Sequence, residues 1–194
     1  NQPLDYPTFT GEYGENLSEH HRFGYELGTR FSREICDAIN NSKKDGLLSI
    51  ILPFVQTETG ANNLTMMIAT HEQAMPKYME ELRGMALATN IDFNTLFMLN
   101  VGESLSTVAD PYTADARFLS LEHCSNYILW PWDAHNEDGG ASDFSEMYWT
   151  NVTIDGANFM GLVYAGLLPS GAFGWNSFGI GFSLNWVGPY DADA

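Results

Sequence analysis

Residues 123–138 read His123-Cys124-Ser-Asn-Tyr-Ile-Leu-Trp-Pro-Trp-Asp-Ala-His135-Asn136-Glu137-Asp138. A thiol heads an apolar run, and a carboxylate follows 14 residues later in a polar cluster. The intervening Pro131-Trp132-Asp133 is typical of a turn, so we predict a β-hairpin that brings Asp138 back beside Cys124. A cysteine becomes a useful nucleophile when a neighbouring group ionises and orients it. The stretch is therefore a candidate catalytic centre; the alternative is a buried strand whose thiol only packs.

The chain before this stretch has the periodicity of helices. Ser18 is a predicted N-cap for a helix that runs to about Asn40, and residues 1–17 are expected to be irregular. Apolar residues recur every four positions and form one stripe of this helix: Phe23, Leu27, Phe31, Ile35 and Ile39. Gly24 and Gly28 lie beside the stripe, where small residues would let another element approach closely. Cys36 in the same helix is interpreted as a packing residue. Further helices are predicted at 47–57 with a break near Pro53, at 62–70, at 76–89 with Tyr78, Leu82, Met85 and Ala86 inside, and at 92–106 with Asp92 as its cap.

The chain from residue 118 onward favours strands. Aromatic and β-branched residues gather in runs separated by Gly, Pro, Asp and Asn, which predicts strands at 118–121, 125–130, 147–154, 158–167 and 180–186. Asp155-Gly156 is a hairpin turn between the third and fourth of these. The glycine-rich segment 171–179 is interpreted as a tight turn between strands. Helices first and strands afterwards predict one α+β unit with a largely antiparallel sheet.

The charge of the chain excludes several kinds of partner. Twenty-five acidic residues face eight basic ones, for a net charge of −17, and every Lys and Arg precedes residue 118. Nucleic acids and anionic membranes attract cationic surfaces, so neither is an expected partner. No apolar run approaches the roughly 20 residues that a membrane span requires. Cys36 and Cys124 form no CxxC or Cys/His pattern, so neither a disulfide framework nor a metal site is expected.

The catalytic interpretation of Cys124 requires a base. No His/Asn constellation of the usual cysteine-protease kind is evident, but cleavage of the 123–124 bond would release an α-amine with a pKa of about 8, suited to accepting the thiol proton. His135 and Glu137 would share one face of a strand and Asn136 and Asp138 the other, which disfavours a metal site there. Asn185, in a predicted apolar strand, is either a satisfied core amide or a donor to an oxyanion.

Four segments in sequence order resemble a known family. They are Phe23-Gly-Tyr-Glu-Leu-Gly28, then Tyr78-Met-Glu-Glu-Leu-Arg-Gly84 with Met98-Leu-Asn100, then Cys124-Ser to His135-Asn-Glu-Asp138, and finally Tyr164-Ala-Gly-Leu-Leu-Pro169 through Gly174-Trp-Asn-Ser-Phe-Gly179 to Leu184-Asn185. The order and content are similar to the N-terminal-nucleophile hydrolases grouped with acyl-CoA:isopenicillin N acyltransferase and the animal β-alanyl-amine hydrolases. His-Asn-Glu-Asp favours the animal branch, because the acyltransferase has Asn-Trp-Asp.

The resemblance implies an αββα sandwich made as a precursor that cleaves itself before the nucleophile. The His123–Cys124 bond would be cut, leaving residues 1–123 and a second chain that begins at Cys124. Asp138 matches the carboxylate that orients the new amino terminus, and Asn185 matches an active-site asparagine of related acylases. His135 and Asn136 are then predicted to contact substrate. No cofactor is implied.

The expected function is hydrolysis of a small N-acyl amine or peptide-like amide through an acyl-enzyme on Cys124, with β-alanyl amines as the favoured class. Two alternatives stay open: transfer of an acyl group from a CoA thioester, and a non-catalytic relative whose sheet serves binding. His123 stands where the family usually has Gly. Family members continue beyond residue 194, so we expect 1–194 to be a single incomplete domain, with the substrate identity, the compartment and the oligomeric state left open.

Overall fold

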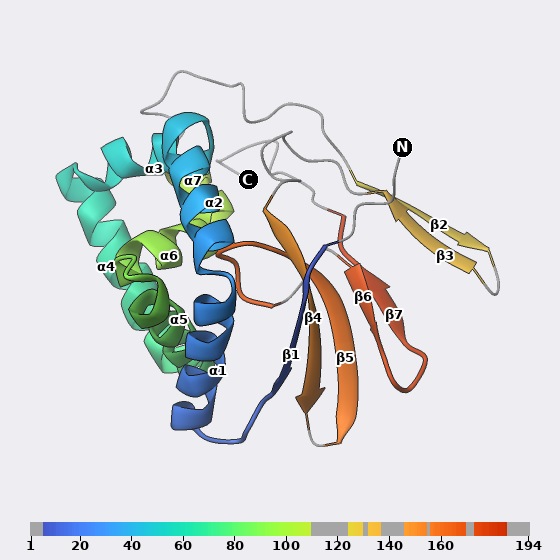
Figure 1. Cartoon of the computed structure of the whole chain (residues 1–194). Helices are drawn as coiled ribbons and strands as arrows, with labels where there is room; N and C mark the ends of the chain where they lie inside the picture. The colour runs from blue at the N-terminus through green and yellow to red at the C-terminus, as the bar shows by residue number, and fades with distance from the viewer. Residues whose placement is uncertain are drawn as a thin grey trace.

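A computed structural model describes residues 6–109, 124–129, 132–136, 146–154, 156–169 and 173–185. Within these ranges a layer of helices covers one face of a five-stranded sheet, and a separate two-stranded hairpin stands beside the far strands of that sheet (Figure 1). The helices are α1 (Leu17–Arg30), α2 (Ser32–Asp45), α3 (Leu47–Val55), α4 (Glu58–Ala74), α5 (Pro76–Thr89), α6 (Phe93–Asn100) and α7 (Gly102–Ala109). The strands are β1 (Thr8–Glu12), β2 (Ser125–Leu129), β3 (Trp132–Asn136), β4 (Met147–Ile154), β5 (Ala157–Tyr164), β6 (Phe173–Asn176) and β7 (Gly181–Ser183). The α+β class is confirmed.

The first predicted helix is two helices. Asn16, and not Ser18, is the N-cap of α1: its side chain accepts from the backbone of Glu19, whose carboxylate accepts from the backbone N–H of Asn16. Such a capping box satisfies two backbone donors at once, which a cap at Ser18 would not do here. The chain leaves the helix at Phe31, whose ring stacks on Tyr148 of β4 at a centroid distance of 3.9 Å, and α2 follows. The five apolar residues of the predicted stripe are all buried, as expected.

The remaining helices differ from prediction mainly in length. Helix α5 has the predicted bounds and Asp92 caps α6, but Tyr78 is 51% exposed and not on the inner face. Pro53 lies inside α3, which ends two residues later. Helix α4 begins earlier than predicted because the Thr57 side chain caps it, and the predicted helix 92–106 divides at Val101 into α6 and α7.

Helices α1 and α5 approach unusually closely, as the small residues Gly24 and Gly28 predicted. A Cβ added to Gly24 would lie 1.9 Å from the carbonyl oxygen of Glu81, and one added to Gly84 would lie 2.0 Å from that of His21. At Gly28 the nearest atom, Ala88 Cβ, would be 3.0 Å away. The atoms nearest to Gly24 and Gly84 belong to the backbone of the other helix, so no flexible side chain could move aside. Only the hydrogen of glycine therefore fits at these two positions.

The sheet has the order β1-β4-β5-β6-β7, and its neighbours are antiparallel except for β1 and β4. Strand β1 lies in the segment predicted to be irregular; it pairs in parallel with β4, Thr8 opposite Trp149. Strand β6 lies in the segment predicted to be a tight turn, and β7 is shorter than the predicted strand 180–186. The β4–β5 hairpin is confirmed, with Gly156 at a φ of +78°. The predicted strand 118–121 lies outside the described residues.

The two faces of the sheet have different environments. On one face Tyr148 and Val152 of β4 and Phe9 of β1 are buried against the helices. Successive residues of a strand point to opposite faces, so Trp149 points away from the helices. The register then places further apolar side chains on that second face, which no described helix covers: Met160, Leu162, Phe173 and Trp175. We call Trp149, Phe173 and Trp175 the aromatic face; Trp175 is 47% exposed.

A buried carboxyl lies between the first strand and the α1–α5 pair. The Tyr13 hydroxyl donates to Glu81 Oε1 at 2.6 Å, and His20 Nδ1 lies 3.5 Å from Glu81 Oε2, with Glu81 fully buried. Burial raises the pKa of Glu81, although contacts with His20 and Tyr13 oppose the shift. Burial likewise raises the pKa of Tyr13.

The replacement Glu81→Gln is expected to flatten the pH dependence of stability. An acid whose pKa is raised in the folded state stabilises the fold below its ordinary pKa and loses that contribution as pH rises through the raised value. The wild type should therefore lose stability relative to Glu81→Gln as pH rises above the ordinary carboxyl range, with a slope of at most about 1.4 kcal/mol per pH unit. Urea unfolding of both proteins at several pH values measures this; parallel curves would contradict it.

Candidate active site

The predicted hairpin is present. Strands β2 and β3 pair antiparallel, with Ser125 opposite Asn136 and Leu129 opposite Trp132. The prediction of a turn over Pro131-Trp132-Asp133 is wrong in its position, because Trp132 and Asp133 belong to β3 and only two residues connect the paired ends.

Cys124 stands immediately before β2 and is half-buried. It is not in a disulfide with Cys36. Strand β3 returns along β2 and ends at Asn136, opposite the residue that follows Cys124, and Asp138 comes two residues later in the sequence. Asp138 and His123 lie outside the described residues. The pairing of Cys124 with Asp138 and the cleavage of the 123–124 bond therefore stay predictions.

His135 links the hairpin to the main sheet. Its Nδ1 lies 2.5 Å from Oδ1 of Asn126, its partner across the hairpin, so a proton on Nδ1 is donated to the amide oxygen. Its ring also contacts Phe173 of β6 at a centroid distance of 5.3 Å. His135 is half-buried and Asn136 exposed. Sequence reasoning missed Asn126; only the hairpin register shows that it faces His135.

The aromatic face continues from this contact. Trp149 lies 5.7 Å from Phe173 and 5.7 Å from Trp175, measured between ring centroids. Phe173 pairs with Ser183 of β7, and Asn185 follows Ser183 by two residues. Asn185 is exposed beyond the end of β7, so its interpretation as a core amide within a strand is wrong. The start of β6 and the end of β7 thus lie at one end of the five-stranded sheet, and the β2–β3 hairpin stands beside that end (Figure 1).

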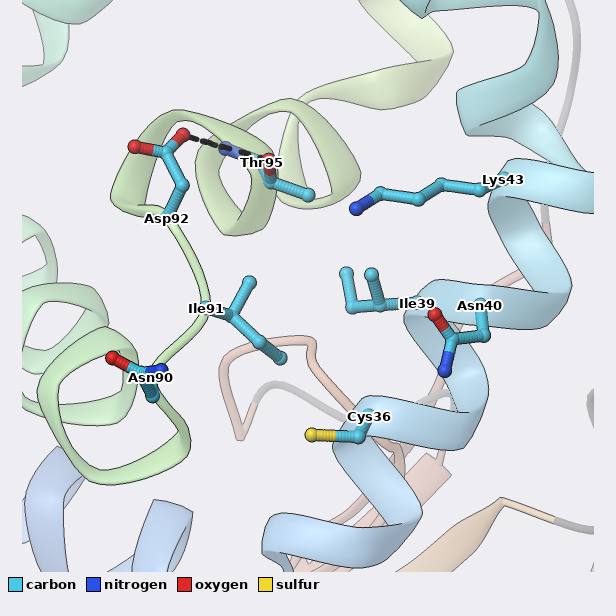
Figure 2. Close-up of a pocket in the computed structure, with 8 residues that line it drawn as sticks. All are labelled: Cys36, Ile39, Asn40, Lys43, Asn90, Ile91, Asp92 and Thr95. Carbon is cyan, nitrogen blue, oxygen red and sulfur yellow. Dashed lines mark hydrogen bonds between the residues drawn. The ribbon is translucent and has the colours of Figure 1, made fainter.

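A second feature is a groove of about 230 Å³ between α2 and the connection from α5 to α6. Figure 2 shows the Cys36 sulfur directed toward Ile91 and the Lys43 ammonium directed toward Thr95. Cys36, interpreted from the sequence as a packing residue, is half-buried and lines this groove without belonging to the core cluster. Of the described residues that were predicted for catalysis or substrate contact, Cys124, His135, Asn136 and Asn185, none lines the groove.

Two other features, a metal site and a membrane-spanning helix, are absent from the described parts of the chain. No group of three or more His, Cys, Asp or Glu side chains in these ranges is arranged to hold a metal ion. Within the same ranges, no helix combines the length and the apolar character needed to cross a membrane.

Comparison with known proteins finds a distant relative that is named a hydrolase. No model of a known protein family matches the chain. The chain is 24% identical, over an alignment of 187 residues, to the beta-alanyl-dopamine/carcinine hydrolase of Drosophila melanogaster, and the alignment covers 87% of this chain and 46% of that protein. The chain thus spans about half the length of the curated relative that it matches. It is a distant relative of a hydrolase, in agreement with the resemblance to β-alanyl-amine hydrolases.

Proposed function

We propose that the chain is part of a cysteine N-terminal-nucleophile amidohydrolase that cleaves a small N-acyl amine, with β-alanyl amines as the favoured substrate class. The observation that carries the proposal is the β2–β3 hairpin. Cys124 lies directly before β2, and β3 brings His135 and Asn136 back toward Cys124. The relative's name supports hydrolysis ahead of acyl transfer, because that protein is called a hydrolase of beta-alanyl-dopamine and carcinine.

The proposed chemistry begins with hydrolysis of the His123–Cys124 bond. The Cys124 thiol attacks the carbonyl carbon of His123, the carbon–nitrogen bond breaks and frees the α-amine of Cys124, and water then cleaves the resulting thioester to release the carboxylate of His123. That amine takes the thiol proton, and the thiolate attacks the substrate carbonyl to form a tetrahedral intermediate. The carbon–nitrogen bond then breaks, the amine leaves with the proton, and a thioester on Cys124 stays behind. Water adds to this thioester, the carbon–sulfur bond breaks, and the acid and the thiol are regenerated.

Four further residues have proposed roles in this sequence of steps. Asp138 holds the α-amine in place, and Asn185 donates to the oxyanion of the tetrahedral intermediate. His135 and Asn136 contact the substrate. The hydrogen bond between His135 Nδ1 and Asn126 supports this role, because it fixes the imidazole ring beside Phe173.

We propose in addition that the complete domain is an αββα sandwich in which a second sheet covers the aromatic face. Apolar side chains gather there, and burying them stabilises a fold by roughly 25 cal/mol per Å² of apolar surface. The contact of His135 with Phe173 supports this arrangement, since it joins the β2–β3 hairpin to the five-stranded sheet. Two sheets that pack face to face lie about 10 Å apart, which side chains of this size fill.

The test of the proposed function is the intact mass of the full-length protein beside Cys124→Ala and Cys36→Ala variants. We expect the wild type and Cys36→Ala to appear as two chains divided before Cys124, because the thiol of Cys124 is the group that attacks the preceding carbonyl. Cys124→Ala should stay whole. A folded wild type that stays whole would contradict the amino-terminal mechanism and leave Cys124 as a half-buried residue ahead of β2.

A further inference from the structure

The side chain of Asn100 joins the helical layer to the connection between β5 and β6. Asn100 is the last residue of α6, and its Nδ2 donates to the carbonyl oxygen of Gly166 at 2.8 Å and to that of Leu96 at 2.9 Å. Its Oδ1 accepts from the backbone N–H of Leu168 at 2.8 Å. The partly buried amide of Asn100 therefore pairs with two backbone groups of a distant turn, the Leu168 N–H and the Gly166 carbonyl. Both groups need a hydrogen-bond partner where water is excluded.

The turn that Asn100 holds is closely fitted to the helices. Gly166 has a φ of +90°, and a Cβ there would lie 2.9 Å from Leu99 Cδ2. The turn closes on itself through a bond from Leu167 N–H to Tyr164 O at 3.1 Å, and Ala165 N–H donates to Glu146 O at 2.7 Å. The turn is therefore bound on one side to α6 and on the other to the residue that precedes β4.

The same turn leads into the candidate active site. Phe173 follows Leu168 by five residues and contacts His135 of the hairpin that carries Cys124. Phe173 also pairs with Ser183, just before Asn185. The turn directly follows β5, whose Gly161 pairs with Gly174 next to Phe173, so a displacement of the turn would shift the start of β6 and the surface against which the hairpin rests.

We propose that Asn100 is a positioning residue: through the turn 164–168 and Phe173 it sets the placement of the hairpin that carries Cys124. It does not touch substrate. The relevance of this placement to hydrolysis rests on the proposed function, whereas the placement itself is a property of the fold that is measurable without any reaction. A positional error of about 1 Å at reacting groups can cost on the order of 10²-fold in rate.

The two cysteines make a direct test possible, because both are half-buried and only Cys124 belongs to the hairpin. The rates of alkylation of Cys124 and Cys36 by iodoacetamide would be measured by mass spectrometry in the full-length wild type and in Asn100→Ala. We expect a several-fold change at Cys124 with no change at Cys36. Asn100→Asp keeps the acceptor for Leu168 N–H but sets a carboxylate oxygen against the carbonyl oxygens of Leu96 and Gly166, so it should give a change at Cys124 at least as large. Asn94→Ala, at an exposed residue of the same helix, is the matched control and should change neither rate.

Each outcome decides the proposal. A selective change at Cys124 supports positioning, and a fall in kcat on the order of 10²-fold with little change in KM extends it to catalysis. If Asn100→Ala changes the alkylation rate of Cys124 selectively but the wild type hydrolyses no amide, positioning is supported and only the proposed function is refuted. Equal changes at both cysteines indicate general loosening of the fold and overturn the proposal, as does the absence of any change in a folded Asn100→Ala protein.

Discussion

Replacement of Cys124 by alanine in the full-length protein is expected to lower kcat/KM for a β-alanyl amine by at least about 10³-fold, because loss of a covalent nucleophile leaves only the contribution of substrate binding and oxyanion stabilisation. Alanine removes the sulfur that we propose attacks the carbonyl, and it keeps the backbone of a residue that lies outside the β2–β3 ladder. Release of the free amine from carcinine, followed by chromatography, measures the effect.

The matched control for this experiment is Cys36→Ala. Cys36 lies in α2 and lines the groove opposite Ile91, and it makes no part of the hairpin. We expect the turnover of Cys36→Ala to equal that of the wild type. Equal activity of Cys124→Ala and the wild type would show that the nucleophile lies elsewhere.

Alanine at Gly24 or Gly84 is expected to produce the largest loss of stability, on the order of 3 kcal/mol for each, because the added methyl group meets a backbone carbonyl at 1.9–2.0 Å. The two helices would have to separate, and their separation would open the packing around Leu27, Leu82 and Met85, which are almost completely buried. Denaturant unfolding of the full-length protein, followed by circular dichroism, measures the loss.

Gly156→Ala is the control that separates crowding from backbone strain. Gly156 has a φ of +78°, which side chains disfavour, but nothing lies within 4 Å of the position that a Cβ would take. Its replacement should cost only the backbone strain of roughly 1–2 kcal/mol. A loss at Gly24 or Gly84 no greater than that at Gly156 would contradict the close approach of α1 and α5.

Periodicity in the sequence predicted the elements whose formation depends on their own residues. The buried stripe from Phe23 to Ile39 and strand β4 follow the predicted pattern, as does helix α5 in its bounds and in its inner face apart from Tyr78. In each case apolar residues recur at the spacing that places them on one face, so neighbours in the sequence contain the signal. The hairpin around Cys124 belongs to the same group, since its two strands are joined by a short connection.

Elements that depend on distant partners were missed. Strand β1 contains no alternating apolar pattern, and it is a strand because β4 offers it a ladder. The division of the first helix at Phe31 accompanies the stacking of that ring on Tyr148, and the division at Val101 accompanies the bonds from Asn100 to the turn beyond β5. Strand propensity of this kind reflects the surroundings more than the residues.

The candidate site divides in the same way. The sequence by itself determined the acidic surface, the helical and strand-rich halves, and the hairpin with Cys124 at its head, because charge and local periodicity are properties of neighbouring residues. Only the tertiary structure decided that His135 meets Asn126 and Phe173, that Asn100 holds the turn before β6, and that Glu81 is buried beside Tyr13 and His20. The physical reason is that contacts between remote segments form only when the fold closes the intervening chain, and no local pattern states which partner each segment will then meet.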